Sequence, residues 1–267
     1  MMWLPGNTSN CIKSCCMINL PKISIITVVY NDVAHIEQTI RSVIGQDYPA
    51  IEYIIIDGDS TDGTREVIKK FEKQIHYWLS EPDKGLYDAM NKGLRKAGGD
   101  YVCFLNSGDR LYQSNVLRQV FGAMEPPYPD VVYGETMITG NDGCEIGLRR
   151  LRAPDSLTWK SLRDGMLVCH QSFFASRNLA PEYDERFRFA ADYDWMLKIL
   201  RKAHTIHNAR CILSSFLDGG VSKKNIRKGL TERFFIMVKN FGFFPTFFRH
   251  FLIAVRFFSF LIKNQRF

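Results

Sequence analysis

Three groups of polar residues each follow a short apolar run. Residues 30–32 follow the first run, residues 57–59 follow the second, and residues 106–109 follow the third. Carboxylate and amide oxygens are the ligands that Mg²⁺ and Mn²⁺ prefer, so these groups could hold a divalent cation that carries a diphosphate. Strands often end in polar turns, which accounts for any one of the groups but less well for all three. The pattern therefore favours a site for a metal-bound diphosphate.

The glycine-rich loops that usually bind nucleotide phosphates are missing from the sequence. No segment matches G-x-x-x-x-G-K-[ST], and the glycines of residues 57–63, Asp-Gly-Asp-Ser-Thr-Asp-Gly, do not fit G-x-G-x-x-G. These absences disfavour a P-loop enzyme and a dinucleotide-dependent dehydrogenase. A sugar nucleotidyltransferase would need a glycine-rich, basic loop for its triphosphate, and none follows the first apolar run.

The apolar runs alternate with segments of helical periodicity. The runs cover residues 23–29, 53–56 and 101–105, and helices are predicted over residues 35–46 and 64–71. This β-α-β-α-β order predicts a parallel sheet with right-handed crossovers. Ligands of such sheets bind at the carboxyl ends of the strands, so the three polar groups are expected to converge on one edge.

The regular alternation ends after Asp109. Further helices are predicted over residues 115–124 and 192–203, and further strands over residues 131–138 and 212–217, with a strand-like stretch at residues 166–169. We interpret this half as a mixed sheet appended to the parallel half. The whole is then an α/β fold of the doubly wound type with a mostly parallel sheet.

The chain of 267 residues carries a formal net charge of +7, and the surplus lies towards its C-terminal end. From residue 223 onward there are ten Lys or Arg residues against one acid, Glu232. Such a charge could reflect nucleic acid, an anionic membrane surface or a phosphorylated substrate, and net charge alone does not choose among them. With the composition of the tail, an anionic membrane surface is the expected partner and nucleic acid is not. The seven cysteines are scattered without the paired spacing of a zinc site, which favours a reduced, cytoplasmic location.

The C-terminal tail is also rich in phenylalanine, since residues 234–267 hold twelve of the twenty in the chain. Charged residues interrupt each apolar stretch before it reaches the roughly 18 residues that span a bilayer. Arg249, Arg256 and Lys263 recur every seven residues, which places them on one face of a helix. These features predict a helix at the inner face of the cytoplasmic membrane. The alternative is a tail packed on the catalytic core or on a dimer partner.

Five segments resemble glycosyltransferase family 2 in their order and spacing. They lie between Pro21 and Gly220 and read SIITVVYND, YIIIDGDSTDGT, SEPDKGLYDAMNKGL, YVCFLNSGD and FAADYDWMLKIL. The third and fourth look like the branch of colanic acid and other exopolysaccharide biosynthesis glycosyltransferases. The resemblance implies a GT-A fold over residues 21–222, followed by a helical tail of residues 223–267. Residues 1–20 are expected to form an N-terminal extension, and one expectation is that this extension is disordered.

The resemblance also implies roles for individual residues. Thr27, Val29 and Tyr30 would line the nucleoside pocket, Asp57 would meet the base or ribose, Asp83 and Lys84 would sit beside the nucleotide, and Asn106 and Ser107 would also contact the donor. Asp109 would be the ligand of Mn²⁺ or Mg²⁺, and Asp192 would be the general base. The implied activity is transfer of a sugar from a nucleoside diphosphate sugar to a hydroxyl of a glycan acceptor, with inversion at the anomeric carbon. We expect that acceptor to be lipid-linked.

Two positions depart from the usual pattern of the family. Many members carry two aspartates after the second strand, and the second reads the base, whereas Gly58 stands there in this chain. The metal motif is often D-x-D, whereas this chain has Asn106-Ser-Gly-Asp109. The preference for a base is therefore open, and Asp109 is the one strong metal ligand in the motif.

Several candidate residues also have an ordinary structural interpretation. Asp192 begins a predicted helix, where a carboxylate can simply cap backbone amides. Asp194 is the alternative base, and it could equally be a solvated or salt-bridged helix residue. His170 and Gln171 are candidates for a contact with phosphate or acceptor, although a lone histidine near apolar residues is more often structural. A noncatalytic protein of the same fold that binds nucleotide sugar or carbohydrate is the alternative function, and a donor-hydrolysis assay separates the two.

Overall fold

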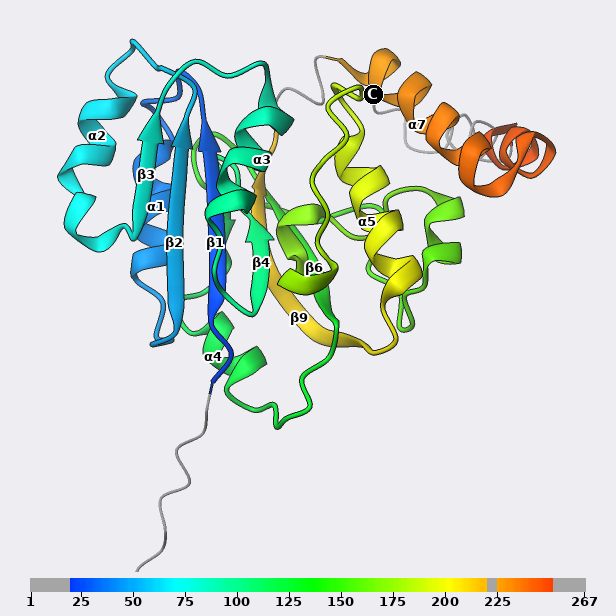
Figure 1. Cartoon of the computed structure of the whole chain (residues 1–267), viewed down its shortest axis with the longest axis horizontal. Coiled ribbons are helices and arrows are strands. Elements are labelled where there is room, and N and C mark those ends of the chain that lie inside the picture. The colour runs from blue at the N-terminus through cyan, green and yellow to red at the C-terminus, as the bar shows by residue number, and fades with distance from the viewer. Residues whose placement is uncertain (1–19, 220–224, 252–267) are drawn as a thin grey trace, which may run out of the picture.

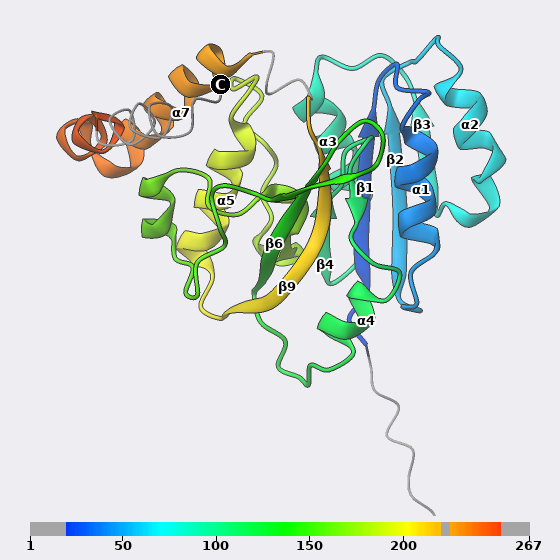
Figure 2. The same cartoon turned by 180° about the vertical axis from the view of Figure 1, so that it is seen from behind.

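The computed structural model describes residues 20–219 and 225–251 (Figures 1 and 2). Its strands are β1 (Ile23–Val29), β2 (Ile51–Asp57), β3 (Tyr77–Ser80), β4 (Tyr101–Phe104), β5 (Arg110–Leu111), β6 (Val131–Thr139), β7 (Glu145–Leu148), β8 (Phe173–Ser176) and β9 (Ile206–Leu217). Its α-helices are α1 (Ile36–Ile44), α2 (Thr64–Lys70), α3 (Leu86–Lys96), α4 (Val116–Phe121), α5 (Ala191–Lys202) and α7 (Ile226–Phe241), and residues 243–251 are also helical. Short 3-10 helices are η1 (Glu72–Gln74), η2 (Trp159–Asp164), η3 (His170–Ser172) and η4 (Arg177–Leu179).

The strands form one nine-stranded sheet. Its order is β3-β2-β1-β4-β8-β6-β9-β5, with β7 paired to β6. Strands β3, β2, β1 and β4 run parallel to one another, β8 is antiparallel to β4 and to β6, and β6 is parallel to β9. The predicted α/β fold is therefore confirmed, with a mostly parallel half and a mixed C-terminal half.

Helices cover both faces of this sheet, as the two opposite views show (Figures 1 and 2). Strand β1 is buried along its whole length, which agrees with its nearly continuous run of apolar and β-branched residues. Helix α1 packs Ile36, Ile40 and Val43 on one face, whereas α3 and α5 pack Met90 and Trp195 on the other. The two apolar layers hold β1, β2 and β4 in parallel, so their carboxyl ends lie at the same edge.

Several details of the sheet differ from the sequence-based expectation. The patterns do not predict β3, β5, β7 or β8, and β9 begins at Ile206 instead of residue 212. The prediction of a strand at residues 166–169 is wrong, because this segment pairs with no strand and is followed by η3 and β8. Met166 and Val168 are buried in the core without strand pairing, and a short apolar run does not distinguish these two ways of burying side chains.

The tail helix α7 packs against the core of the α/β fold. Ile236 and Met237 are each 1% exposed and belong to the same apolar cluster as α3 and α5. Within the described ranges, no helix has the length and apolarity needed to cross a bilayer. The expectations for residues 1–19 and 252–267, including Arg256 and Lys263, lie outside the described residues.

Candidate active site

Asp57 ends β2 opposite Val29, the last residue of β1. Its buried carboxylate accepts hydrogen bonds from the Ser60 amide at 3.0 Å, from the Ser60 hydroxyl at 2.5 Å and from the Ser80 hydroxyl at 2.6 Å. These bonds tie the loop after β2 to the end of β3. The contact of Asp57 with a base or ribose stays a prediction, and here the carboxylate is turned towards donors of the protein.

Gly58 leaves room for the side chain of Asp83. A Cβ atom placed on Gly58 would lie 2.4 Å from Oδ2 of Asp83 and 3.2 Å from Cδ2 of Tyr30. The other carboxylate oxygen of Asp83 accepts the N–H of Gly85 at 2.9 Å, which orients the group. The Tyr30 side chain is 65% exposed. A carboxylate oxygen and an open aromatic ring thus flank one point at the sheet edge, an arrangement suited to a planar base.

The remaining residues of the predicted nucleoside pocket differ in burial. Thr27 is fully buried, and its hydroxyl lies 3.2 Å from the Tyr53 hydroxyl, so it supports β1 from inside the core. Val29 is also buried, at the end of β1. Lys84 is exposed, and its backbone N–H donates to Asp88 at 2.9 Å. Of these residues, Lys84 is the one whose side chain is accessible to a ligand.

Asp109 is held from two sides in the turn between β4 and β5. Its Oδ2 accepts a hydrogen bond from Gln171 Nε2 at 2.7 Å, and its Oδ1 accepts the N–H of Leu217 at 3.1 Å. Burial raises the pKa of Asp109 to about 6, and the nearby charge of Asp32 adds to this shift, although the Gln171 hydrogen bond opposes it. A nearby cation would stabilise the ionised form of such a carboxyl group. Gln171 therefore supports Asp109, and its direct contact with phosphate or acceptor stays a prediction.

Asn106 and Ser107 lie in the same turn as Asp109 and contact His170 and Asp32. The Oδ1 atom of Asn106 is buried without a hydrogen-bond partner among the described residues, and its Nδ2 lies 3.3 Å from His170 Nε2. The Ser107 hydroxyl donates to Asp32 at 2.6 Å, and the other oxygen of Asp32 lies 2.5 Å from His35 Nδ1. An unsatisfied amide oxygen in the same short turn as a buried carboxylate fits a divalent cation with oxygen ligands.

The protein would supply only part of the coordination of such a cation. In the ranges that the structure describes, no group of three or more His, Cys, Asp or Glu side chains could hold a metal ion. Magnesium ions in nucleotide sites commonly use one or two carboxylates together with substrate phosphates and water. The residues around Asp109 therefore fit a cation that arrives with a diphosphate.

Asp192, the second residue of α5, belongs to a chain of polar side chains. Its Oδ2 lies 3.4 Å from His170 Nδ1, and its Oδ1 accepts the Tyr87 hydroxyl at 3.4 Å and the Tyr193 N–H at 2.8 Å. Burial alone would raise the pKa of Asp192, but the hydrogen bond and charge of His170, with the charge of Arg233, hold that pKa below its ordinary value. An ionised carboxylate in this position can take a proton from a substrate hydroxyl.

Asp194, the alternative base, has a different environment. It is buried in α5, and its Oδ2 lies 2.6 Å from Lys198 Nζ, one helical turn further on. This pair matches the salt-bridged role that the sequence leaves open for Asp194. The assignment of Asp192 as the general base stays a prediction, with a local geometry that favours it over Asp194.

Sequence reasoning misses three residues that surround the site. His35 pairs with Asp32, and Glu232 and Arg233 of α7 approach the start of α5. Glu232 does carry a signal, because an isolated acid in a strongly basic segment suggests a specific partner. The backbone amides that bind Glu232 are not predictable from spacing, since they lie more than 40 residues earlier in the chain.

The sequence profile described as Glycosyl transferase family 2 matches residues 24–182. The chain belongs to glycosyltransferase family 2.

Curated relatives of this family 2 glycosyltransferase align over most of its length. It is 35% identical over 210 residues to an uncharacterized glycosyltransferase of Mycobacterium tuberculosis, which covers 77% of this chain and 78% of the relative. It is 30% identical over 200 residues to TuaG of Bacillus subtilis, whose name provisionally assigns it to teichuronic acid biosynthesis, with 73% and 79% covered. These relatives share the transferase class of the family.

Solved structures share the fold of this family 2 glycosyltransferase. TarS of S. aureus in complex with UDP has a TM-score of 0.63 at 18% identity, covering 81% of this chain and 65% of that chain. A mannosyltransferase of Pyrobaculum calidifontis in complex with GDP-Man and Mn²⁺ has a TM-score of 0.60 at 18% identity, covering 82% and 65%. The chain thus spans less than two thirds of either protein, and the likeness shows the GT-A fold.

Proposed function

We propose that this protein is a metal-dependent, inverting glycosyltransferase that moves a sugar from a nucleoside diphosphate sugar to a hydroxyl of a lipid-linked glycan acceptor. Synthesis of a cell-surface polysaccharide is the process in which we place it. The observation that carries the proposal is the polar chain from Asn106 through His170 to Asp192 at the edge where nucleotide would bind. The UDP and GDP-Man complexes of proteins with this fold support a nucleotide sugar as donor.

In this proposal Asp192 acts as the general base of a single displacement. It removes the proton of the acceptor hydroxyl while that oxygen forms a bond to the anomeric carbon. The bond from this carbon to the diphosphate oxygen breaks on the opposite face, so the anomeric configuration inverts. His170 and Tyr87 orient the Asp192 carboxylate, and the lowered pKa of Asp192 keeps it ionised and ready to accept the proton at neutral pH.

A divalent cation, Mn²⁺ or Mg²⁺, would be held by Asp109 and by the unsatisfied oxygen of Asn106. When bound, it would neutralise charge on the departing diphosphate. Gln171 and the Leu217 N–H keep the Asp109 carboxylate fixed. Lys84 is exposed at the end of the loop that carries Asp83, where its charge would attract the same diphosphate.

Asp83 supports a proposal about the base of the donor. A carboxylate oxygen accepts hydrogen bonds and cannot donate them. Uracil and guanine present an imino N–H on their pairing edge, whereas cytosine presents a lone pair at the corresponding nitrogen. With Tyr30 as a stacking surface and Asp83 Oδ2 beside it, we expect a donor that carries uridine or guanosine.

Calorimetry in Mn²⁺ is expected to show UDP or GDP binding about 10- to 100-fold tighter than CDP, the value of one hydrogen bond to a charged group. Asp83→Asn keeps an oxygen for the Gly85 N–H and places an amino group towards the base, so it should weaken or reverse this preference. Asp59→Asn changes a neighbouring carboxylate that pairs with Arg65, and serves as the matched control.

The binding measurements test the role of Asp83 separately from the proposed activity. If Asp83→Asn and the wild type show the same ratio of UDP or GDP to CDP affinity, Asp83 does not read the base. If none of the nucleotides binds, the proposed glycosyltransferase activity itself is contradicted.

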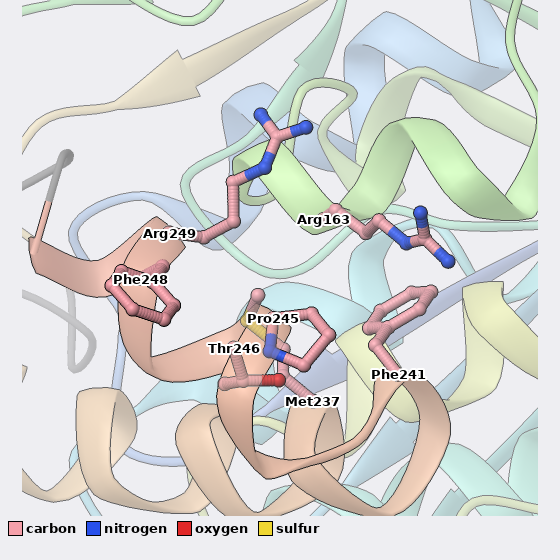
Figure 3. Close-up of a pocket in the computed structure, with 7 residues that line it drawn as sticks. All are labelled: Arg163, Met237, Phe241, Pro245, Thr246, Phe248 and Arg249. Atoms are coloured by element: carbon pink, nitrogen blue, oxygen red, sulfur yellow. The ribbon is translucent and has the colours of Figure 1, made fainter.

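We also propose that the tail docks on an anionic membrane. Five phenylalanines that follow α7 are each more than half exposed: Phe243, Phe244, Phe247, Phe248 and Phe251. A cavity of about 270 Å³ lies between η2 and this end of the tail, with Arg163 and Arg249 among its mostly apolar lining (Figure 3). Exposed aromatic rings next to arginines suit the boundary between headgroups and acyl chains. Docking there would bring the enzyme to a lipid-linked acceptor.

The full-length protein is expected to sediment with phosphatidylglycerol vesicles, and less so at high salt because salt screens the charges. Replacing Phe244 and Phe247 together by Ser should lower the partition coefficient by about tenfold or more, since a buried phenylalanine contributes on the order of 1.5–3 kcal/mol. Ile146→Ser removes an equally exposed apolar side chain on β7 and is the control. Wild-type protein left in the supernatant at low salt would instead support a tail that serves only packing.

A noncatalytic protein that binds nucleotide sugar is the alternative function. It would share the nucleotide affinity but release no nucleoside diphosphate from a donor. Slow hydrolysis of UDP-N-acetylglucosamine or GDP-mannose that depends on Asp192 distinguishes the enzyme from this alternative.

A further inference from the structure

Helix α7 contacts the segment that leads into α5 through one carboxylate. Glu232 Oε1 accepts the N–H of Arg188 at 3.0 Å, and Glu232 Oε2 accepts the N–H groups of Phe189 at 2.8 Å and Ala190 at 3.0 Å. Three backbone amides in a row are therefore satisfied by a single side chain from another helix. An ionised acceptor makes each of these bonds stronger than a neutral one would be.

This contact lies at the N-terminus of the helix that carries the proposed base. Ala190 is the N-cap residue of α5, and it offers no side chain that could cap the free amides. From outside the helix, Glu232 satisfies the amide of Ala190 itself and the two amides before it, at an end of the helix where a negative charge is also favoured by the helix dipole. Asp192 follows Ala190 by two residues. The direction of the Asp192 side chain therefore depends on a backbone that Glu232 holds.

The next residue of α7 is also turned towards α5. The Arg233 guanidinium carbon lies 5.5 Å from the centre of the Tyr193 ring, and Arg233 Nε is buried without a hydrogen-bond partner among the described residues. The charge of Arg233 helps to hold the pKa of Asp192 below its ordinary value. In the same turn Phe235 is 63% exposed. One turn of α7 thus faces the active site on one side and solvent on the other.

We infer that Glu232 is a positioning residue of the active site, which sets the orientation of Asp192 through the backbone of residues 188–190. The inference rests on the proposed role of Asp192 as the general base. It makes α7 part of the catalytic unit and not only an attachment to it. A displacement of about 1 Å at a catalytic group can cost two orders of magnitude in rate, so loss of the three bonds should be visible in turnover.

The test compares variants of residue 232 in two backgrounds, wild type and Asp192→Asn. The measured quantities are kcat and KM for hydrolysis of UDP-N-acetylglucosamine and GDP-mannose, and the Kd of UDP and GDP. In the wild-type background, Glu232→Ala should lower kcat roughly 10- to 100-fold with KM and Kd nearly unchanged. Glu232→Gln keeps one acceptor oxygen, so its kcat should lie between that of the wild type and that of Glu232→Ala. Thr231→Ala, which removes only a hydrogen bond within α7 to Arg227, is the control.

The second background separates positioning from general damage. If Glu232 acts through Asp192, Glu232→Ala should cause little further loss in Asp192→Asn, because there is no base left to misplace. An equal loss of kcat in both backgrounds would overturn the inference and reduce Glu232 to a structural residue.

A measurement that needs no turnover separates failure of this inference from failure of the proposed function. Amide hydrogen exchange of residues 188–190 should quicken in Glu232→Ala while exchange in β1 stays slow, which also shows that the variant folds. Unchanged exchange at these amides would overturn the positioning role. If exchange quickens but neither donor is hydrolysed even by the wild type, the proposed function fails and the contact is structural only.

Discussion

Replacing Asp192 by Asn is expected to lower turnover by roughly two to four orders of magnitude, the usual contribution of a positioned general base. The amide is nearly isosteric and can still accept the Tyr193 N–H and the Tyr87 hydroxyl. It cannot take a proton from the acceptor at neutral pH. Affinity for UDP and GDP, measured by calorimetry, should therefore stay nearly unchanged, and the loss should appear in kcat.

The matched control for this variant is Asp194→Asn, two residues further along the same helix. It removes the carboxylate that pairs with Lys198 and should reduce stability with little effect on the rate per folded molecule. The opposite pattern, a collapse of kcat in Asp194→Asn and a near-normal kcat in Asp192→Asn, would move the general base to Asp194.

Replacing Asp109 by Asn is expected to abolish the dependence of nucleotide binding on Mn²⁺ while making the metal-free protein more stable at neutral pH. The folded protein retains the Asp109 proton up to about pH 6, whereas the unfolded chain releases it near pH 3.8. Ionisation of Asp109 therefore costs stability as pH rises through this window. The difference between the two pKa values lowers the free energy of unfolding by roughly 3 kcal/mol at pH 7. This is the upper limit on the stability that Asp109→Asn can gain.

The Asn side chain can be accommodated because Gln171 can turn its amide. The Oε1 atom of Gln171 has no hydrogen-bond partner among the described residues, so it can accept the new amino group. Thermal melts in chelator at pH 7.5 and pH 5 should show a gain that is larger at pH 7.5. Asp47→Asn, which affects an exposed pair with Arg118, should show no such gain. Nucleotide affinity that still rises with Mn²⁺ in Asp109→Asn would contradict the assignment of this carboxylate as metal ligand.

Much of the fold follows from local sequence patterns. The buried strand β1 and the amphipathic helix α1 are predictable because each pattern reports directly on one element. Strand β8 is not predictable in this way. It has four residues, and its antiparallel pairing with β4 depends on a chain that returns after more than 70 residues. Local pattern says little about pairing at such a distance.

The candidate site was harder to predict than the sheet edge that carries it. Sequence reasoning predicts Asp57 at the sheet edge and names Gln171 as a candidate contact for phosphate or acceptor, but it cannot show which hydrogen-bond donors and acceptors the protein already uses. The Asp57 carboxylate is occupied by Ser60 and Ser80, and Gln171 by Asp109. The role of Glu232 is likewise invisible in the sequence, because its three partners are backbone amides that have no residue type to recognise.

The shared space of Gly58 and Asp83 links the residue types at these two positions. A Cβ atom at position 58 would lie 2.4 Å from Oδ2 of Asp83, so the Asp83 side chain would have to turn away to admit it. A carboxylate introduced at position 58 would therefore take the place of Asp83 beside Tyr30, and the acid next to the ring would be supplied by the other loop.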